Sequence, residues 1–205
     1  MTIDPAAVKT RHDMHDLITA FIMPRPIAWV STVDAHGVYN LAPFSFFTAV
    51  SVKPPMVCIA IGRKKGGQKK DTIRNIESSR DFVVNIVDES LAEAMNQTSA
   101  EYAPEEDEFA EVRLTPVRSD IVKSPRVAES PLNLECELRQ VLEFGEEPEG
   151  HSLVIGEVVR FHIRDELCTG THIDVSKLKH VGRLGGAQFY CRTSDRFEME
   201  RPKLS

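Results

Sequence analysis

A short basic segment with two glycines could bind phosphate. It runs from Arg63 to Lys70 and is followed by Thr72, where a helix can begin. Lysine ammonium groups, a threonine hydroxyl and exposed backbone N–H groups can together hold a phosphate, and a helix N-terminus adds partial positive charge. The glycine spacing does not fit a Walker A loop. From composition alone, a solvated basic loop is the simpler interpretation.

A second segment, residues 40–47 (Asn-Leu-Ala-Pro-Phe-Ser-Phe-Phe), combines small polar residues with three phenylalanines. Pro43 removes a backbone donor and interrupts regular strand pairing. A site for a planar ring needs apolar surface together with a few hydrogen-bonding groups. The segment therefore fits a ring-binding site and a bulged core strand equally well.

The chain shows no motif for nucleophilic or metal-dependent catalysis: no nucleophile elbow, no HExxH and no zinc-deaminase signature. His12, Asp13, His15 and Asp16 superficially resemble a metal site, but no third ligand nearby supports them. We therefore expect neither a catalytic side chain nor a bound metal.

The elements that must position these segments are mainly β-strands. Alternating and β-branched runs predict strands over residues 27–33, 38–42, 44–52, 56–61, 82–87, 132–144 and 152–163. Turns at 34–37 and 145–150 predict two hairpins. Short helices are expected over 71–79, 89–98 and 173–178, a solvated acidic loop over 102–111, and irregular structure over 181–190. Helices do not alternate regularly with strands, so a closed antiparallel barrel is expected rather than a doubly wound parallel sheet.

Length, charge and composition argue against several classes of protein. The 205 residues suit one domain over 1–205, and the formal net charge of −6 argues against nonspecific nucleic-acid binding. No apolar stretch is long enough for a membrane span, and the N-terminus lacks the apolar core of a signal peptide. The four cysteines form no CxxC pair, and a reducing cytoplasm fits them best. Cys58 and Cys136 lie among apolar strand residues and are expected to be small buried hydrophobic groups.

Several short segments, taken in order, resemble the flavin reductase-like family with an FMN-binding split barrel, especially its flavoredoxin-like branch. They cover most of the chain and lie at residues 24–32, 40–47, 70–76, 82–85, 94–96, 129–131, 156–159 and 183–186. Each segment alone is common, whereas their order and spacing together are specific to the family.

The resemblance implies a mainly β fold, a homodimer of split barrels, and FMN at or near the subunit interface, with FAD as an alternative flavin. It places Ser31 and Thr32 near the flavin. It assigns Asn40, Ala42, Ser45 and Phe46 to the ring and ribityl side, and Lys70 and Thr72 to the phosphate end.

The expected function is that of an FMN-binding oxidoreductase, a flavin reductase that takes a hydride from NADH or NADPH as a transient donor. Such chemistry belongs to the cofactor, so the missing catalytic motifs do not count against it. The alternatives are a non-enzymatic FMN electron carrier of the flavoredoxin type and a flavin-binding module without turnover. An electron-transfer protein or a flavin-dependent monooxygenase is the expected partner, with no nucleic-acid or membrane partner.

Overall fold

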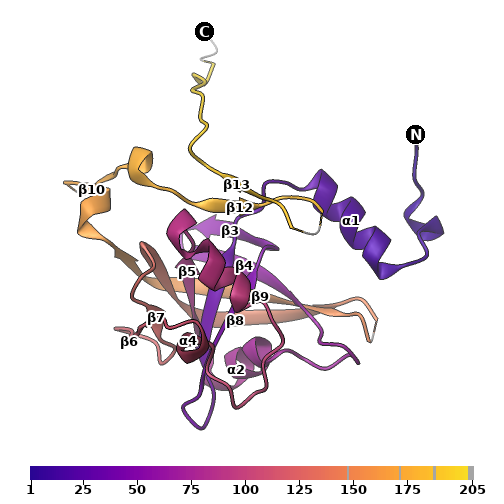
Figure 1. Ribbon diagram of the computed structural model, residues 1–205, viewed down its shortest axis with the longest axis horizontal. Coiled ribbons are helices and arrows are strands. Elements are labelled where there is room, and N and C mark those ends of the chain that lie inside the picture. Colours follow the sequence, from indigo (N-terminus) through magenta and orange to yellow (C-terminus); the bar gives the residue numbers. More distant parts are fainter. Residues whose placement is uncertain (147, 171, 187, 203–205) are drawn as a thin grey trace.

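A seven-stranded antiparallel sheet organises the chain. The computed structural model describes residues 1–146, 148–170, 172–186 and 188–202. The strands follow the order β2-β1-β5-β8-β9-β4-β3 across the sheet (Figure 1). Their bounds are β1 Ala28–Val33, β2 Tyr39–Phe44, β3 Phe47–Val52, β4 Pro55–Gly62, β5 Asp81–Ile86, β8 Leu132–Phe144 and β9 His151–Ile163. The expected mainly β fold is confirmed.

The two edges of this sheet are joined by very little chain. β2 and β3 lie at opposite edges, yet only Ser45 and Phe46 separate them. The N–H of Ala60 in β4 donates to the carbonyl of Phe46 at 2.8 Å. The sheet must therefore curl until its edges meet, which makes it a split barrel. We expected one strand over 44–52, but the chain changes edges at Ser45 and Phe46 and so interrupts that strand.

Both predicted hairpins are present. β1 pairs with β2 and β8 pairs with β9, each in antiparallel register. In the first turn the Asp34 carboxylate accepts hydrogen bonds from the backbone N–H groups of His36 and Val38, both at 2.8 Å. Gly37 closes the turn with φ +88°, a backbone conformation that L side chains rarely adopt.

The interior of the barrel is apolar and closely packed. Its fully buried members include Ile59, Ile61, Val84 and Phe82. Gly156 in β9 permits this packing, because a Cβ there would come within 2.5 Å of the Phe82 ring. A second cluster around Trp29 lies outside the barrel wall.

Short helices and small strands surround the barrel. The helical elements are η1 Pro5–Ala7, α1 Arg11–Phe21, α2 Asp71–Ser79, η2 Glu89–Leu91, α3 Ala92–Gln97, α4 Glu108–Glu111, η3 Asp165–Leu167 and η4 Val175–Lys177. The small strands are β6 Pro116–Val117, β7 Arg126–Val127, β10 Cys168–Thr169, β11 His172–Ile173, β12 Val181–Arg183 and β13 Tyr190–Arg192. Figure 1 shows α1 and the β12–β13 pair above the barrel, with the C-terminal segment projecting away from it. No helix in the described ranges is long and apolar enough to cross a membrane.

Three local expectations are corrected. The helix expected over 173–178 is a single 3-10 turn, η4, because β11 occupies the start of that range. The range 181–190 is not wholly irregular, since β12 pairs with β13 across it. The acidic segment 102–111 is not wholly solvated, because α4 buries Glu108 and Phe109 against β2.

Candidate functional site

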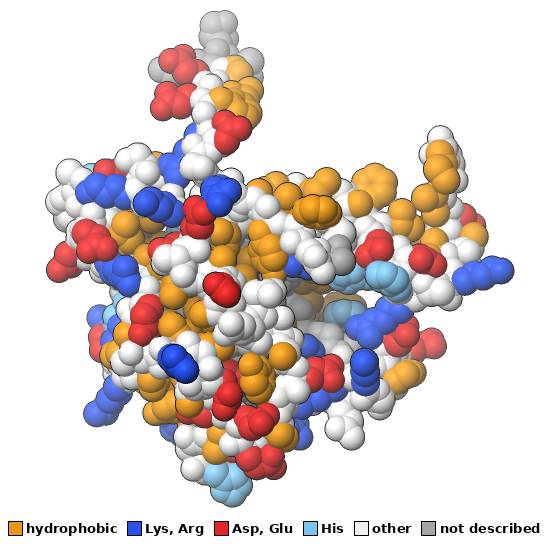
Figure 2. Space-filling view, viewed as in Figure 1, with side chains coloured by type: hydrophobic (Ala, Val, Ile, Leu, Met, Phe, Trp, Pro, Cys, Tyr) orange, Lys and Arg blue, Asp and Glu red, His pale blue; other side chains and the backbone are white. Residues whose placement is uncertain are grey.

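A wide pocket opens where β2 ends, between α1, α3 and the C-terminal strands. Its volume is about 740 Å³. In the space-filling view the surface is hollowed below α1, and histidine side chains lie beside the hollow (Figure 2). This wide pocket is lined by His15, Arg25, Ile27, Pro43, Phe44, Ser45, Met95, Asn96, Ser99, Arg183, Gly186, Gln188 and Tyr190.

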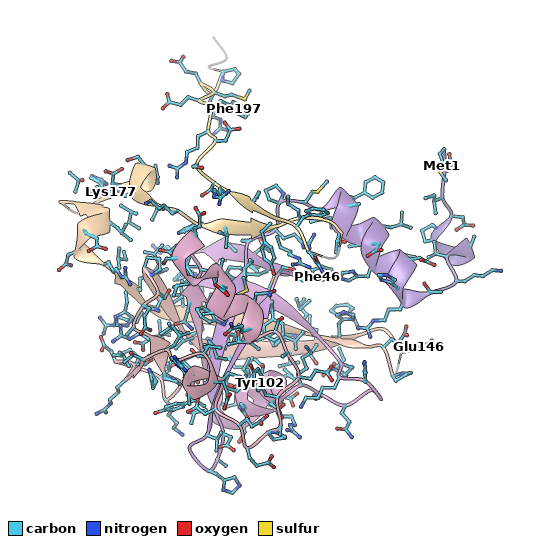
Figure 3. All side chains as sticks on the ribbon, in the orientation of Figure 1. Met1, Phe46, Tyr102, Glu146, Lys177 and Phe197 are labelled. Carbon is cyan, nitrogen blue, oxygen red and sulfur yellow. The ribbon has the colours of Figure 1, made fainter. Side chains whose placement is uncertain are left out.

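A smaller pocket of about 210 Å³ lies at the start of α2. We call it the lysine pocket. In Figure 3 the labelled Tyr102, one of its lining residues, lies close to α2. The lining residues are Asn40, Ala42, Pro43, Lys64, Lys70, Asp71, Thr72, Thr98, Ser99, Ala100, Glu101, Tyr102 and Glu108.

The two pockets adjoin one another, and we call them together the groove. Pro43 and Ser99 line both of them, so the pockets meet at these two residues. One end of the groove is wide and carries arginine and aromatic side chains. The other is narrow and carries two lysines together with the acidic residues Asp71, Glu101 and Glu108. An elongated ligand with a bulky ring at one end matches this shape, and Lys70, which forms no ion pair within the described chain, is the cation that could bind an anion at the narrow end.

Arg25 holds the walls of the wide pocket together. Its side chain is buried, and its guanidinium donates to Ser45 Oγ at 3.2 Å and to the carbonyls of Thr19 and Leu184 at 3.0 and 3.1 Å. Burial, together with the nearby positive charge of Arg183, lowers the Arg25 pKa from its ordinary value. The wide pocket therefore contains a fixed positive charge close to Ser45.

Phe46 packs beneath α1, as Figure 3 shows. Its ring stacks on the imidazole of His15, with centroids 6.2 Å apart and planes 9° apart. The Arg25 guanidinium carbon lies 5.9 Å from the same ring centroid. Phe46 is thus half-buried behind two residues of the wide pocket, His15 and Arg25, and supports that wall.

Lys70 and Thr72 both line the lysine pocket, and their role at a phosphate stays a prediction. Lys70 is half-buried, and burial, reinforced by the positive charges of Lys64 and Arg11, lowers its pKa from the ordinary value. In the described part of the chain Lys70 forms no ion pair, whereas Lys64 pairs with Asp71. No side chain caps the N-terminus of α2, so backbone N–H groups there are free to bind an anion.

Asn40 links three elements at this end of the groove. Its amide oxygen accepts from the Thr72 hydroxyl at 3.1 Å, and its amide nitrogen donates to Glu108 Oε1 at 3.2 Å. Because the Thr72 hydroxyl hydrogen is used by Asn40, the contribution of Thr72 to an anion site would come through its backbone N–H. Ala42, two residues along β2, lines the same pocket.

Ser31 and Thr32 lie elsewhere. Both are fully buried and neither lines the groove. Ser31 Oγ donates to the carbonyl of Pro125 at 2.5 Å and accepts from Asn85 at 3.0 Å. Thr32 Oγ1 accepts from Asn75 at 3.1 Å. Their observed contacts are with the protein interior, and their placement beside a flavin stays a prediction.

Sequence reasoning missed several residues of the groove. Glu108 was assigned to a solvated acidic loop, because clustered acidic residues are usually solvated. The segments that carry the family resemblance contain Arg25, Met95 and Arg183, but no role was assigned to these three residues. His15 was noticed only as part of a metal-like spacing that was set aside, and α1, which carries it into the pocket, was not predicted.

Comparison with known proteins fits this architecture. Residues 20–175 match the flavin reductase like domain. The chain belongs to the flavin reductase-like family. A relative in Halalkalibacterium halodurans, an uncharacterized protein, is 38% identical over 208 residues, covering 100% of this chain and 98% of the relative.

Solved structures of this family superpose closely on the chain. Nitrilotriacetate monooxygenase component B from Bacillus cereus is 37% identical, with a TM-score of 0.91 over 97% of this chain and 98% of that one. The 2-nitrobenzoate 2-nitroreductase of Pseudomonas fluorescens is 33% identical, with a TM-score of 0.88 over 98% and 96%. Flavoredoxin of Desulfovibrio vulgaris, at 20% identity and a TM-score of 0.75 over 97% of both chains, shares the fold.

Proposed function

We propose that this flavin reductase-like protein binds FMN in the groove and uses NADH or NADPH to reduce it. The observation that carries the proposal is that the wide pocket and the lysine pocket adjoin, with Pro43 and Ser99 in the lining of both. The wide pocket would take the ring system, and the lysine pocket the phosphate.

The residues present fit such a ligand. Lys70 is a half-buried cation that forms no ion pair within the described chain, beside the uncapped N-terminus of α2. A phosphate would give Lys70 a direct, charge-assisted hydrogen-bond partner. FAD is the alternative flavin, because it has the same ring system and ribityl phosphate as FMN.

Binding, orientation and charge are what the chain itself supplies. When bound, a flavin accepts a hydride from a nicotinamide and passes the electrons to an acceptor. Arg25 and Arg183 give the wide pocket a positive field, which favours a ligand that gains negative charge on reduction. No side-chain nucleophile or proton donor is required for the hydride step, in keeping with the lack of catalytic motifs.

Two wider features complete the proposal. We infer a homodimer, and a flavin-dependent monooxygenase or an electron-transfer protein as the consumer of the reduced flavin. Support for the first kind of partner comes from the Bacillus cereus neighbour, which is itself a monooxygenase component. The described cysteines are free thiols, which suits a reducing cytoplasm.

A bulky substitution where the two pockets meet tests the proposal. Ser99→Trp would place an indole where the pockets meet, so we expect FMN-dependent oxidation of NADH or NADPH to fall to background in a steady-state assay. Ser78→Trp is the matched control, because Ser78 is an exposed serine in α2 outside both pockets. Absence of FMN-dependent oxidation by the wild type, or full activity of Ser99→Trp, would refute the proposal.

A further inference from the structure

A buried carboxyl group faces the proposed phosphate end of the groove. Glu108 is 8% exposed and lines the lysine pocket. Its Oε1 accepts from the Asn40 amide at 3.2 Å, and its Oε2 accepts from the backbone N–H of Leu41 at 3.1 Å. Two donors from β2 therefore hold the carboxyl group in place at the pocket wall.

The charges around Glu108 do not neutralise it. In the described chain Glu108 forms no ion pair, and the charges that act on it are those of Asp107, the N-cap residue of α4, and Asp71 of α2. Burial, reinforced by these two negative charges, raises the pKa of Glu108 to about 7. The neutral form is therefore accessible near physiological pH.

The other charged residues of the lysine pocket are largely matched to one another. Asp71 forms ion pairs with Lys64 and Arg74. Although burial opposes it, these pairs hold the pKa of Asp71 below its usual value. Lys70 is the cation available to a ligand, and the negative charge of Glu101 acts on it. Among the described residues, Glu101 and Glu108 are the acidic groups of the pocket without an ion pair; Glu101 is exposed to solvent, whereas Glu108 is buried and would meet a phosphate without solvent screening.

We propose that Glu108 recognises the ligand phosphate as a neutral carboxylic acid, so that binding of FMN takes up one proton at this side chain. This inference rests on the proposed function. An ionised carboxylate would repel a phosphate dianion in a partly buried site. A protonated carboxyl group instead offers an O–H donor to a phosphate oxygen, while its two oxygens can still accept from Asn40 and Leu41.

Proton uptake at Glu108 determines how the affinity for FMN changes with pH. Phosphate beside Glu108 stabilises the neutral form, so the pKa of Glu108 is higher in the complex than in the free protein. Affinity for FMN is then full below about pH 7 and falls as the pH rises above it, because binding must take a proton from increasingly basic solution. Between pH 7 and pH 9 we expect a loss of about tenfold or more. Riboflavin, which lacks the phosphate, should show no such loss.

Calorimetric titration at pH 8 tests the inference directly. A phosphate ester has its second pKa near 6, so FMN enters as the dianion. Titrations in buffers with different ionisation enthalpies give the number of protons taken up. We expect close to one for the wild type with FMN, and close to none with riboflavin or for Glu108→Gln with FMN.

Glu105→Gln is the matched control, since Glu105 is an exposed glutamate in the same segment, and it should take up protons as the wild type does. Glu108→Gln should bind FMN more tightly than the wild type at pH 9 and about equally at pH 6. Wild-type binding without proton uptake overturns the inference, whether or not Glu108→Gln folds. Uptake that persists in Glu108→Gln would also overturn it, and would point to Lys70. Failure of the wild type to bind any flavin would instead refute the proposed function itself.

Discussion

Nε of Arg25 donates a hydrogen bond to Oγ of Ser45 at 3.2 Å, and so joins the segment before β1 to the bend between β2 and β3. The same guanidinium donates to the carbonyls of Thr19, Ile22 and Leu184. One buried side chain therefore ties α1, the β2–β3 bend and the segment after β12 into a single wall around the wide pocket.

Arg25→Lys should weaken both folding and flavin binding. A lysine ammonium group cannot span the acceptors that the planar guanidinium reaches. Each hydrogen bond to a charged group is worth about 1.5–3 kcal/mol, so we expect a loss of about 2–4 kcal/mol in the free energy of unfolding and a weaker FMN Kd. Urea denaturation and fluorescence titration measure the two effects. Arg139→Lys, a half-exposed arginine that pairs with Glu157 at the surface, should change stability by less than about 1 kcal/mol. Equal effects of the two substitutions would contradict the role given to Arg25.

Lys70→Ala should weaken the binding of FMN much more than the binding of riboflavin. If Lys70 binds the phosphate through a charge-assisted hydrogen bond, its removal raises the Kd for FMN by about tenfold or more. Riboflavin should be much less affected, because it has no phosphate. The control is Lys65→Ala, an exposed lysine in the same loop. An equal loss of affinity for both flavins would remove Lys70 from the phosphate role.

Exposed apolar side chains lead us to expect a dimer in solution. Phe21 at the end of α1 is 86% exposed and Val52 at the end of β3 is 92% exposed, and a partner subunit could cover such side chains. Light scattering after size-exclusion chromatography should give twice the 23.0 kDa mass of one chain. A clean monomer at micromolar concentration would count against a flavin site shared between subunits.

Much of the barrel could be predicted from local pattern. Alternating β-branched residues and the turn at Gly37 were sufficient to predict β1, β2 and their pairing. The long hairpin of β8 and β9 was equally clear from two alternating runs around a turn. Such patterns involve residues that are close together in the sequence, so they can be recognised without a structure.

The site was harder to predict because it depends on contacts between distant segments. Glu108 gains its buried position only when α4 packs on β2, a contact that no local pattern encodes. The hydrogen bonds that Ser31 and Thr32 form with distant residues could not be predicted from the sequence either. Lys70 and Thr72 were predicted because the basic loop and the helix start are adjacent in the chain.

The most direct test of the central claim is anaerobic mixing of the FMN-loaded protein with NADH and, separately, with NADPH, followed by the flavin absorbance band. We predict that at least one nicotinamide bleaches the band within minutes, as dithionite does in a parallel sample. Bleaching by dithionite but by neither nicotinamide would contradict the reductase assignment, and would favour a flavoprotein that carries electrons between protein partners.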